Sequence, residues 1–251
     1  MTETRITMST SVHPPQSHSP ATPHVLDNPA WAALTGPHDR FAERVGRAAR
    51  YRADVSPFTA LADPADPRAW DDLATLVGPG NVTPFSGTVP PPEGWETVES
   101  GQGVQLVDTA LRAEPAPEAV RLGSDDVPEV LDLIARTKPG PFLPRTIELG
   151  TYLGIRHDGR LVAMAGERLH PPGWTEISAV CTDPAHRGRG LATRLVRAVA
   201  AGIRERGDIP FLHASAANTG AIRLYESIGF TLRRRTAFLL LRVPGGKEHT
   251  T

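Results

Sequence analysis

Cysteine is almost absent from this 251-residue sequence, which contains only Cys181. A single cysteine cannot form an internal disulfide, and it excludes a zinc site built from several cysteines. Hydrophobic runs are also short, and none approaches the roughly 18 apolar residues that a membrane helix needs. We therefore expect neither a disulfide framework nor a membrane span.

An excess of charge of either sign is also missing. The chain has 27 basic and 28 acidic residues, a formal net charge of −1. This balance gives no broad electrostatic attraction to nucleic acid or to a membrane surface. Pro and Gly together make up 48 residues, below the share that indicates wholesale disorder. The composition predicts a cytoplasmic globular protein of one large or two small domains.

The N-terminal part divides into a tail and a small module. Residues 1–24 are rich in Ser, Thr, Pro and His and have no apolar periodicity, so we expect a disordered tail without a secretory signal. Residues 25–114 predict a small α+β module. Its expected elements are helices over 39–50 (Phe41, Val45 and Ala48 at helical spacing) and 68–77, and strands over 82–85 and 103–108.

Residues 115–251 show a regular order of elements, β-α-β-β-β-α-β-α-β. Three consecutive strands separated by tight turns predict an antiparallel meander. The expected strands cover 120–122, 151–156, 160–169, 174–182, 210–215 and 230–243, the last range holding one or two strands; the expected helices follow Ser124 and cover 190–206 and 218–228.

The most informative segment is VCTDPAHRGRGLATRL at 180–195, where a strand leads through a Gly- and Arg-rich loop into a helix. Backbone N–H groups in such a loop, at the positive end of a helix dipole, form an anion site suited to a pyrophosphate. Gly188 and Gly190 would let the backbone approach the phosphates. A dinucleotide fingerprint fails here because Thr193 occupies the place of its last glycine.

The same loop resembles motif A of the GCN5-related N-acetyltransferase (GNAT) superfamily, with Arg187, Gly190 and Ala192 at its defining positions. Residues 217–230, ANTGAIRLYESIGF, resemble motif B of that superfamily. The resemblance covers about half of the chain and is strongest to the FR47-like branch. It implies an α+β GNAT fold, with a mixed, mostly antiparallel central sheet and flanking helices, preceded by the N-terminal module.

The resemblance also implies acetyl-CoA as cosubstrate and no metal. In this fold two strands splay apart, here near 182 and 211, and the pantetheine arm adds to the open edge. The residues expected to contact the cofactor are Val180, Cys181, Thr182, Arg187, Gly188, Arg189, Gly190, Leu191, Ala192, Thr193 and Asn218.

Two residues are candidates for catalysis. Glu176 precedes Arg187 by the spacing at which histone-acetyltransferase relatives carry a general base, and strand alternation places it on the face of Ser178 and Val180. We expect its pKa to be raised by a partly apolar cleft; the alternative is a solvated carboxylate. Tyr225 matches the motif B tyrosine that protonates the coenzyme A thiolate, and the alternative is a core tyrosine.

Other reactive residues have simpler interpretations. Cys181 could be a nucleophile but is more typical of a small core residue. The histidines His170, His186 and His213 do not share a metal-binding spacing, so we expect them to be solvated or hydrogen-bonded. An arginine among residues 233–235 could meet an acidic acceptor or the cofactor 3′-phosphate, although a solvated strand edge is the preferred interpretation.

The sequence thus predicts an N-acyltransferase that moves an acetyl group from acetyl-CoA to a primary amine by direct attack. A small-molecule acceptor is favoured, and a homodimer is left open. The alternatives are a non-catalytic acetyl-CoA-binding sensor and a protein-lysine acetyltransferase. The N-terminal module is interpreted either as a separate unit or as a degenerate GNAT-like half.

Overall fold

The computed structural model describes residues 24–245, so the expected tail lies outside it except for His24. The described chain forms a continuous eleven-stranded sheet in the order β1-β2-β3-β4-β11-β5-β10-β9-β8-β7-β6. Neighbouring strands are antiparallel except for the pairs β3–β4 and β9–β10. Within residues 24–245 no helix is both long and apolar enough to span a bilayer.

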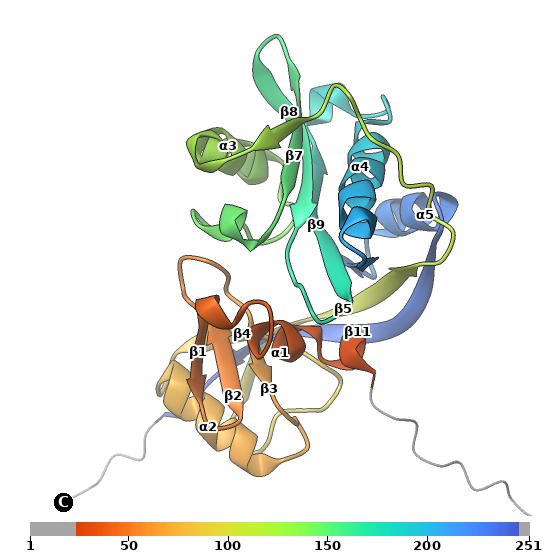
Figure 1. Ribbon diagram of the computed structural model, residues 1–251. Coiled ribbons are helices and arrows are strands. Elements are labelled where there is room, and N and C mark those ends of the chain that lie inside the picture. Colours follow the sequence, from red (N-terminus) through yellow and green to blue (C-terminus); the bar gives the residue numbers. More distant parts are fainter. Residues whose placement is uncertain (1–23, 246–251) are drawn as a thin grey trace, which may run out of the picture.

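The N-terminal part contributes four short strands and two helices (Figure 1): β1 (Ala42–Val45), β2 (Ala48–Tyr51), β3 (Thr59–Leu61), β4 (Val82–Ser86), α1 (Pro29–Leu34) and α2 (Pro67–Val77). The helix expected over 39–50 is wrong, because β1 and β2 form a hairpin there. Gly46 has a φ of +49° and opens a two-residue turn at 46–47, and such a turn fixes a hairpin. Asp66 accepts a hydrogen bond from the backbone N–H of Arg68 and caps α2, the helix that the sequence predicts over 68–77.

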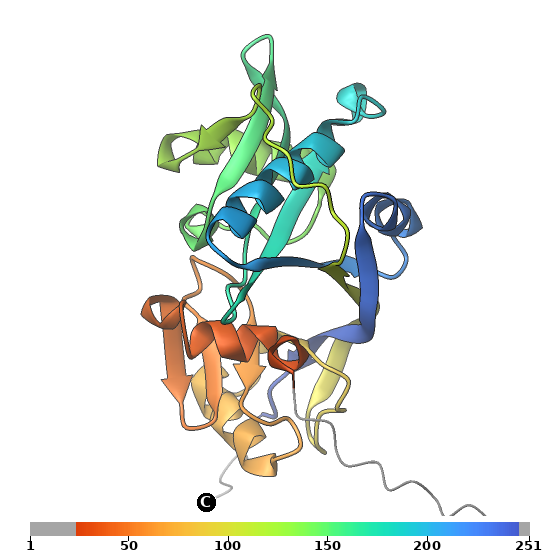
Figure 2. The same cartoon turned by 45° about the vertical axis from the view of Figure 1, so that its right-hand side comes forward.

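Two long strands join the N-terminal part to the rest of the molecule (Figures 1 and 2). They are β5 (Glu96–Asp108) and β11 (Phe230–Arg242), each of 13 residues. The second half of β11 pairs with β4 on one edge. The whole length of β11 pairs with β5 on the other edge, and β5 in turn pairs with β10. Residues 96–108, assigned from the sequence to the N-terminal module, therefore form a central strand of the shared sheet.

The C-terminal part follows the predicted order closely. Its elements are β6 (Val120–Leu122), α3 (Val127–Thr137), β7 (Tyr152–His157), β8 (Arg160–Glu167), β9 (Trp174–Thr182), α4 (Leu191–Glu205), β10 (Ile209–Ser215) and α5 (Thr219–Ser227). The predicted meander is confirmed, since β7, β8 and β9 pair antiparallel in sequence. The region expected to hold one or two final strands is the single strand β11.

Helices cover the two faces of the C-terminal sheet (Figure 2). Leu195, Val199 and Ile203 of α4 are buried against Ile177 and Leu212 of the sheet. On the other face, Val130 and Leu133 of α3 pack with Met164 and Cys181. A separate apolar cluster joins the N-terminal part to the sheet through contacts of Leu26, Phe41 and Tyr51 with Leu169 and Phe211. The predicted mixed, mostly antiparallel sheet with flanking helices is confirmed.

Candidate functional site: a cleft between two diverging strands

The sheet opens between β9 and β10. These parallel neighbours pair from Trp174 with Ile209 to Ile177 with Leu212, and there the pairing stops. Beyond that point β9 continues along β8, and β10 continues along β5. The backbone edges of 178–182 and 213–215 thus face each other without a ladder between them, as predicted.

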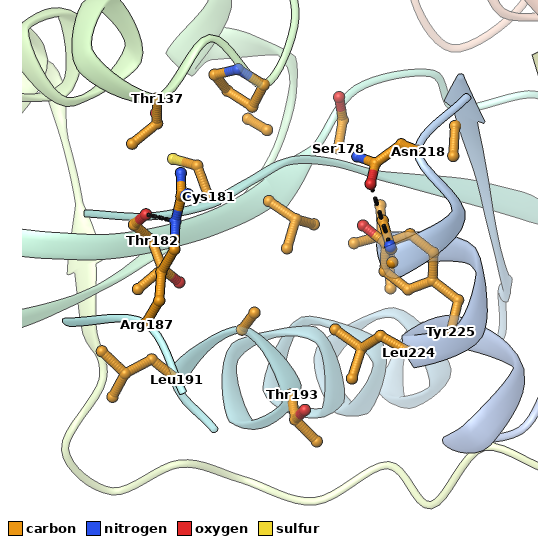
Figure 3. Close-up of a pocket in the computed structure, with 18 of the residues that line it drawn as sticks. Thr137, Ser178, Cys181, Thr182, Arg187, Leu191, Thr193, Asn218, Leu224 and Tyr225 are labelled. Carbon is orange, nitrogen blue, oxygen red and sulfur yellow. Dashed lines mark hydrogen bonds between the residues drawn. The ribbon is translucent and has the colours of Figure 1, made fainter. Parts of the chain in front are cut away.

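A cavity of about 730 Å³ fills this opening. Its wall is formed by the edges of β9 and β10, the start of α4, the first two turns of α5 and the end of α3 (Figure 3). Thr182 and Arg187 lie at one side of the cavity, with Asn218 and Tyr225 at the other. The expected site residues that line it are Val180, Cys181, Thr182, Arg187, Gly188, Gly190, Leu191, Ala192, Thr193, Asn218 and Tyr225. Arg189 and Glu176 do not line it.

A β-bulge re-aims the side chains of β9 at the cavity. Met164 pairs with Cys181 and Gly166 with Ser178, so β9 carries one extra residue there. Ala179 has a φ of +53°, a left-handed conformation that is uncommon for a residue with a Cβ. The expected alternation is therefore wrong beyond Ser178: Val180 packs in the same cluster as Ile177, away from the face of Glu176.

The loop before α4 has the geometry expected of an anion site. Gly188 and Gly190 have φ values of +75° and +72°, and Gly190 is the N-cap of α4. The first amide that bonds back into α4 is that of Arg194, which donates to the Gly190 carbonyl at 3.1 Å. The amides of 191–193 therefore have no intrahelical acceptor, and they lie beside the cavity at the positive end of a 15-residue helix.

Helix α5 brings two motif B residues to the opposite wall. The Asn218 Oδ1 accepts a hydrogen bond from the Ala221 N–H at 3.1 Å, so Asn218 caps the N-terminus of α5. Tyr225 is 7% exposed and lines the cavity while its ring packs edge-on against Phe230. Burial, and then the neighbouring Cys181, raises the pKa of Tyr225 to about 12, so its hydroxyl is protonated at neutral pH.

Glu176 lies in a different environment from the one expected. Its side chain is fully buried, and Arg168 donates two hydrogen bonds to the carboxylate, at 2.8 and 2.6 Å. The His213 Nδ1 lies 2.7 Å from the Glu176 Oε1. Burial alone would raise the pKa of Glu176, but the charge and hydrogen bonds of Arg168, with His213, outweigh it and lower the pKa to about 2. The expectation of a raised pKa is wrong.

His213 connects this carboxylate to a second polar residue. The Gln105 side chain is held by the Arg233 guanidinium, which donates to its Oε1 at 2.8 Å, and by its own Nε2 donating to the Leu26 carbonyl at 2.9 Å. The remaining Gln105 N–H points to the His213 Nε2 at 3.1 Å. A donor at Nε2 and a carboxylate at Nδ1 fit the tautomer of His213 that carries its proton on Nδ1 and donates it to Glu176.

The remaining reactive residues have structural surroundings. Cys181 is buried in the α3 cluster, and burial raises the pKa of its thiol, so it stays protonated. Arg233 and Arg234 both donate to Asp27, at 2.7 and 2.9 Å, whereas Arg235 is exposed. In the described part of the chain, no three His, Cys, Asp or Glu side chains form an arrangement that could hold a metal ion.

Comparison with known proteins identifies the family. A profile of FR47-like proteins matches residues 152–239. A solved structure of a putative acetyltransferase of the GNAT family from Novosphingobium aromaticivorans is 40% identical, with a TM-score of 0.80, over 88% of this chain and 99% of that one. The chain belongs to the GNAT family. A GCN5-related N-acetyltransferase from Kribbella flavida, 20% identical with a TM-score of 0.57, shares the GNAT fold over 86% of this chain and 95% of its own.

Curated acetyltransferases match part of this chain. The N-alpha-acetyltransferase RimI of Mycobacterium tuberculosis is 38% identical over 105 residues, 39% of this chain and 63% of RimI. A mycothiol acetyltransferase of Thermobispora bispora is 43% identical over 83 residues, 33% of this chain and 27% of that protein. The match thus spans less than two thirds of either curated relative.

Three residues around the GNAT cleft were missed from the sequence: Arg168, His213 and Gln105. The position of Arg168 could have been predicted from the sequence, because the turn at 171–173 sets a register between the two strands that places Arg168 opposite Glu176. In the structure the Arg168 N–H donates to the Glu176 carbonyl at 3.0 Å. His213 was expected only to be solvated or hydrogen-bonded. Nothing in the sequence indicates that Gln105 lies next to His213, because β5 and β10 pair although they are more than 100 residues apart in sequence.

Proposed function

We propose that this protein transfers an acetyl group from acetyl-CoA to a primary amine by direct attack within a ternary complex. The observation that supports this most is the cleft itself. One cavity joins the glycine loop at the start of α4, the open edge of β9 and the protonated hydroxyl of Tyr225. The curated RimI and mycothiol acetyltransferase relatives support acetyl transfer in general.

The proposed position of acetyl-CoA follows from the chemistry of the cavity wall. The pyrophosphate would accept hydrogen bonds from backbone N–H groups of the 188–193 segment. The pantetheine arm would add to the open edge of β9 between Ser178 and Thr182, as a further strand would. The thioester would then lie in the opening between β9 and β10, within reach of residues on both strands.

The proposed reaction forms a C–N bond between the amine and the thioester carbonyl carbon and breaks the C–S bond. The amine loses one proton and the coenzyme A sulfur gains one. Tyr225 would donate the proton to the sulfur, as a hydroxyl that is protonated at neutral pH can. The proton released by the amine then restores Tyr225 through solvent, so no net proton is consumed.

We further propose that His213, rather than Glu176, takes the proton from the amine. Glu176 is fully buried and does not line the cavity, and a carboxylate with a pKa of about 2 is a weak base. In the tautomer that donates from Nδ1, the His213 Nε2 carries a lone pair, which accepts a hydrogen bond from a Gln105 N–H at 3.1 Å. An amine can replace that one donor while Gln105 keeps its other two bonds. Glu176 would orient His213 and stabilise the imidazolium that forms.

The test is an assay of the full chain with acetyl-CoA and a panel of primary amines, with measurement of free thiol and of acetylated product by mass spectrometry. Acetyl-CoA binding without any acetylated amine would contradict the proposal and favour a sensor. His213→Gln is expected to lower kcat by about 10²–10⁴-fold while acetyl-CoA affinity is kept. His157→Gln, at a half-exposed histidine that ends β7 and does not itself line the cavity, is the matched control.

A further inference from the structure

A second cavity, of about 200 Å³, lies on the other side of Arg168 and His213 from the cofactor cleft. Those two residues line both cavities. The remaining wall comes from the N-terminal part together with β5 and β11, including Leu26, Phe58, Phe85, Gln105, Arg234 and Phe238. The cavity therefore exists only because the N-terminal part packs against the GNAT sheet.

The two ring nitrogens of His213 face different partners. Nδ1 is bound to the buried Glu176, and Nε2 points to Gln105, a residue that lines the second cavity and not the first. A molecule in the second cavity therefore meets the lone pair of Nε2. Because His213 lines both cavities, an amine at Nε2 and a thioester in the first cavity would lie beside the same imidazole, where the amine can reach the thioester carbon.

The second cavity combines an apolar lining with an excess of positive charge. Three phenylalanine side chains face it, Phe58, Phe85 and Phe238. Its ionisable lining residues are Asp27, Arg168, His213 and Arg234. Arg168 is neutralised by Glu176, but the single carboxylate of Asp27 serves two guanidinium groups, those of Arg233 and Arg234. One positive charge is left over at this end of the cavity.

Both arginines reach Asp27 because β11 is irregular there. The register of β11 against β5 shifts between Leu232 and Arg234, so simple alternation fails at Arg233. Each guanidinium has five N–H donors, and Arg234 uses one of its terminal nitrogens to reach Asp27 while its side chain is 32% exposed. Arg234 therefore keeps donors for a further carboxylate.

We infer that the second cavity is the acceptor site, and that it takes a primary amine with an apolar or aromatic body and an anionic group, such as a hydrophobic amino acid. This inference rests on the proposed function. The amine would lie at the His213 Nε2, the apolar body among the phenylalanines and the carboxylate at Arg234. A polyamine would be a poor acceptor, because it would bring further positive charge to a site that already has an excess.

The experiment compares L-phenylalanine, phenethylamine and spermidine as acceptors for the wild type, Arg234→Gln and Arg235→Gln. Phenylalanine is expected to be the best of the three. Arg234→Gln should raise the KM for phenylalanine at least tenfold and leave the KM for phenethylamine within about twofold, since only phenylalanine carries the carboxylate. Arg235→Gln, an exposed neighbour on the same strand, should change neither value.

Two results would overturn the inference while leaving acetyl transfer intact. They are spermidine as the best acceptor, and an equal effect of Arg234→Gln on both phenyl compounds. If no amine is acetylated, the proposed function fails, and calorimetric titration of phenylalanine into the coenzyme A complex still tests the cavity. Binding that Arg234→Gln weakens would support the acceptor site, and the absence of binding would contradict it.

Discussion

At the residue scale, the bidentate pair between Arg168 and Glu176 decides how the site can be tested. Both side chains are removed from solvent, with 14% and 0% of their surface exposed. Replacing Glu176 with Gln would leave the Arg168 guanidinium buried without a counter-charge, which typically costs about 3–5 kcal/mol. A loss of activity in Glu176→Gln would therefore mix a folding defect with a catalytic one, whereas His213→Gln leaves the ion pair in place.

The same pair predicts a loss of stability in acid. The pKa of Glu176 is about 2 in the folded protein and near 4.5 in an unfolded chain, so the carboxylate stabilises the fold above pH 4.5. That contribution, about 3 kcal/mol, is lost as the pH falls from 4.5 towards 2. Urea unfolding at several pH values should show it, with Glu176→Gln flatter across this window than the wild type. Glu205→Gln, which removes an exposed carboxylate at the end of α4, should keep the wild-type slope.

Tyr225 allows a test of its chemical role through the leaving group. Tyr225→Phe should keep acetyl-CoA affinity and slow turnover, because the departing thiolate loses its proton donor. The loss should shrink with a thioester of a more acidic thiol, which leaves without help. A loss of equal size with both thioesters, measured as kcat with a fixed amine, would assign Tyr225 to packing instead.

At the element scale, the start of α4 is where sequence and structure agree best. Gly190 combines a left-handed φ of +72° with a position at the helix N-terminus. Gly190→Val should weaken acetyl-CoA binding, because a β-branched residue is strained at this φ and its side chain would stand where the pyrophosphate is expected. Calorimetry with coenzyme A measures the change, and unaltered affinity in a folded variant would remove the pyrophosphate assignment.

Gly202 provides the matched control within the same helix. It lies inside α4 with ordinary helical geometry, and a Cβ added there meets only the end of the Arg206 side chain at 3.7 Å. Gly202→Ala should keep coenzyme A affinity and stabilise the protein by up to about 1 kcal/mol.

Elements with a local signature could be predicted from the sequence, and elements defined by distant pairing could not. The helices α4 and α5 have apolar residues on one face and end two residues before Gly207 and Gly229, so their bounds were predicted within one or two residues. The hairpin of β1 and β2 was predicted as a helix, because Phe41, Val45 and Ala48 lie at helical spacing on either side of the Gly46–Arg47 turn. The bulge at Ala179 has no sequence signature, and it decides which side chains of β9 face the cleft.

At the scale of the whole molecule, the chain contains one glycine loop with the motif A pattern, although its sheet extends over two regions. We therefore predict one tight acetyl-CoA site per chain. Calorimetric titration should give a stoichiometry near one. Two tight sites would show that the N-terminal part binds the cofactor as well, in keeping with the interpretation of that part as a GNAT-like half.

The position of β11 has a consequence for how the chain folds. β11 lies between β4 and β5, although it begins more than 120 residues after β5 ends. During synthesis and refolding, β4 and β5 must leave a strand-wide gap, because direct pairing between them would exclude β11 from the sheet. Contacts between residues so far apart in sequence form slowly, and their unpaired edges stay exposed in the meantime. The protein should therefore refold slowly and be most prone to aggregate before β11 is inserted.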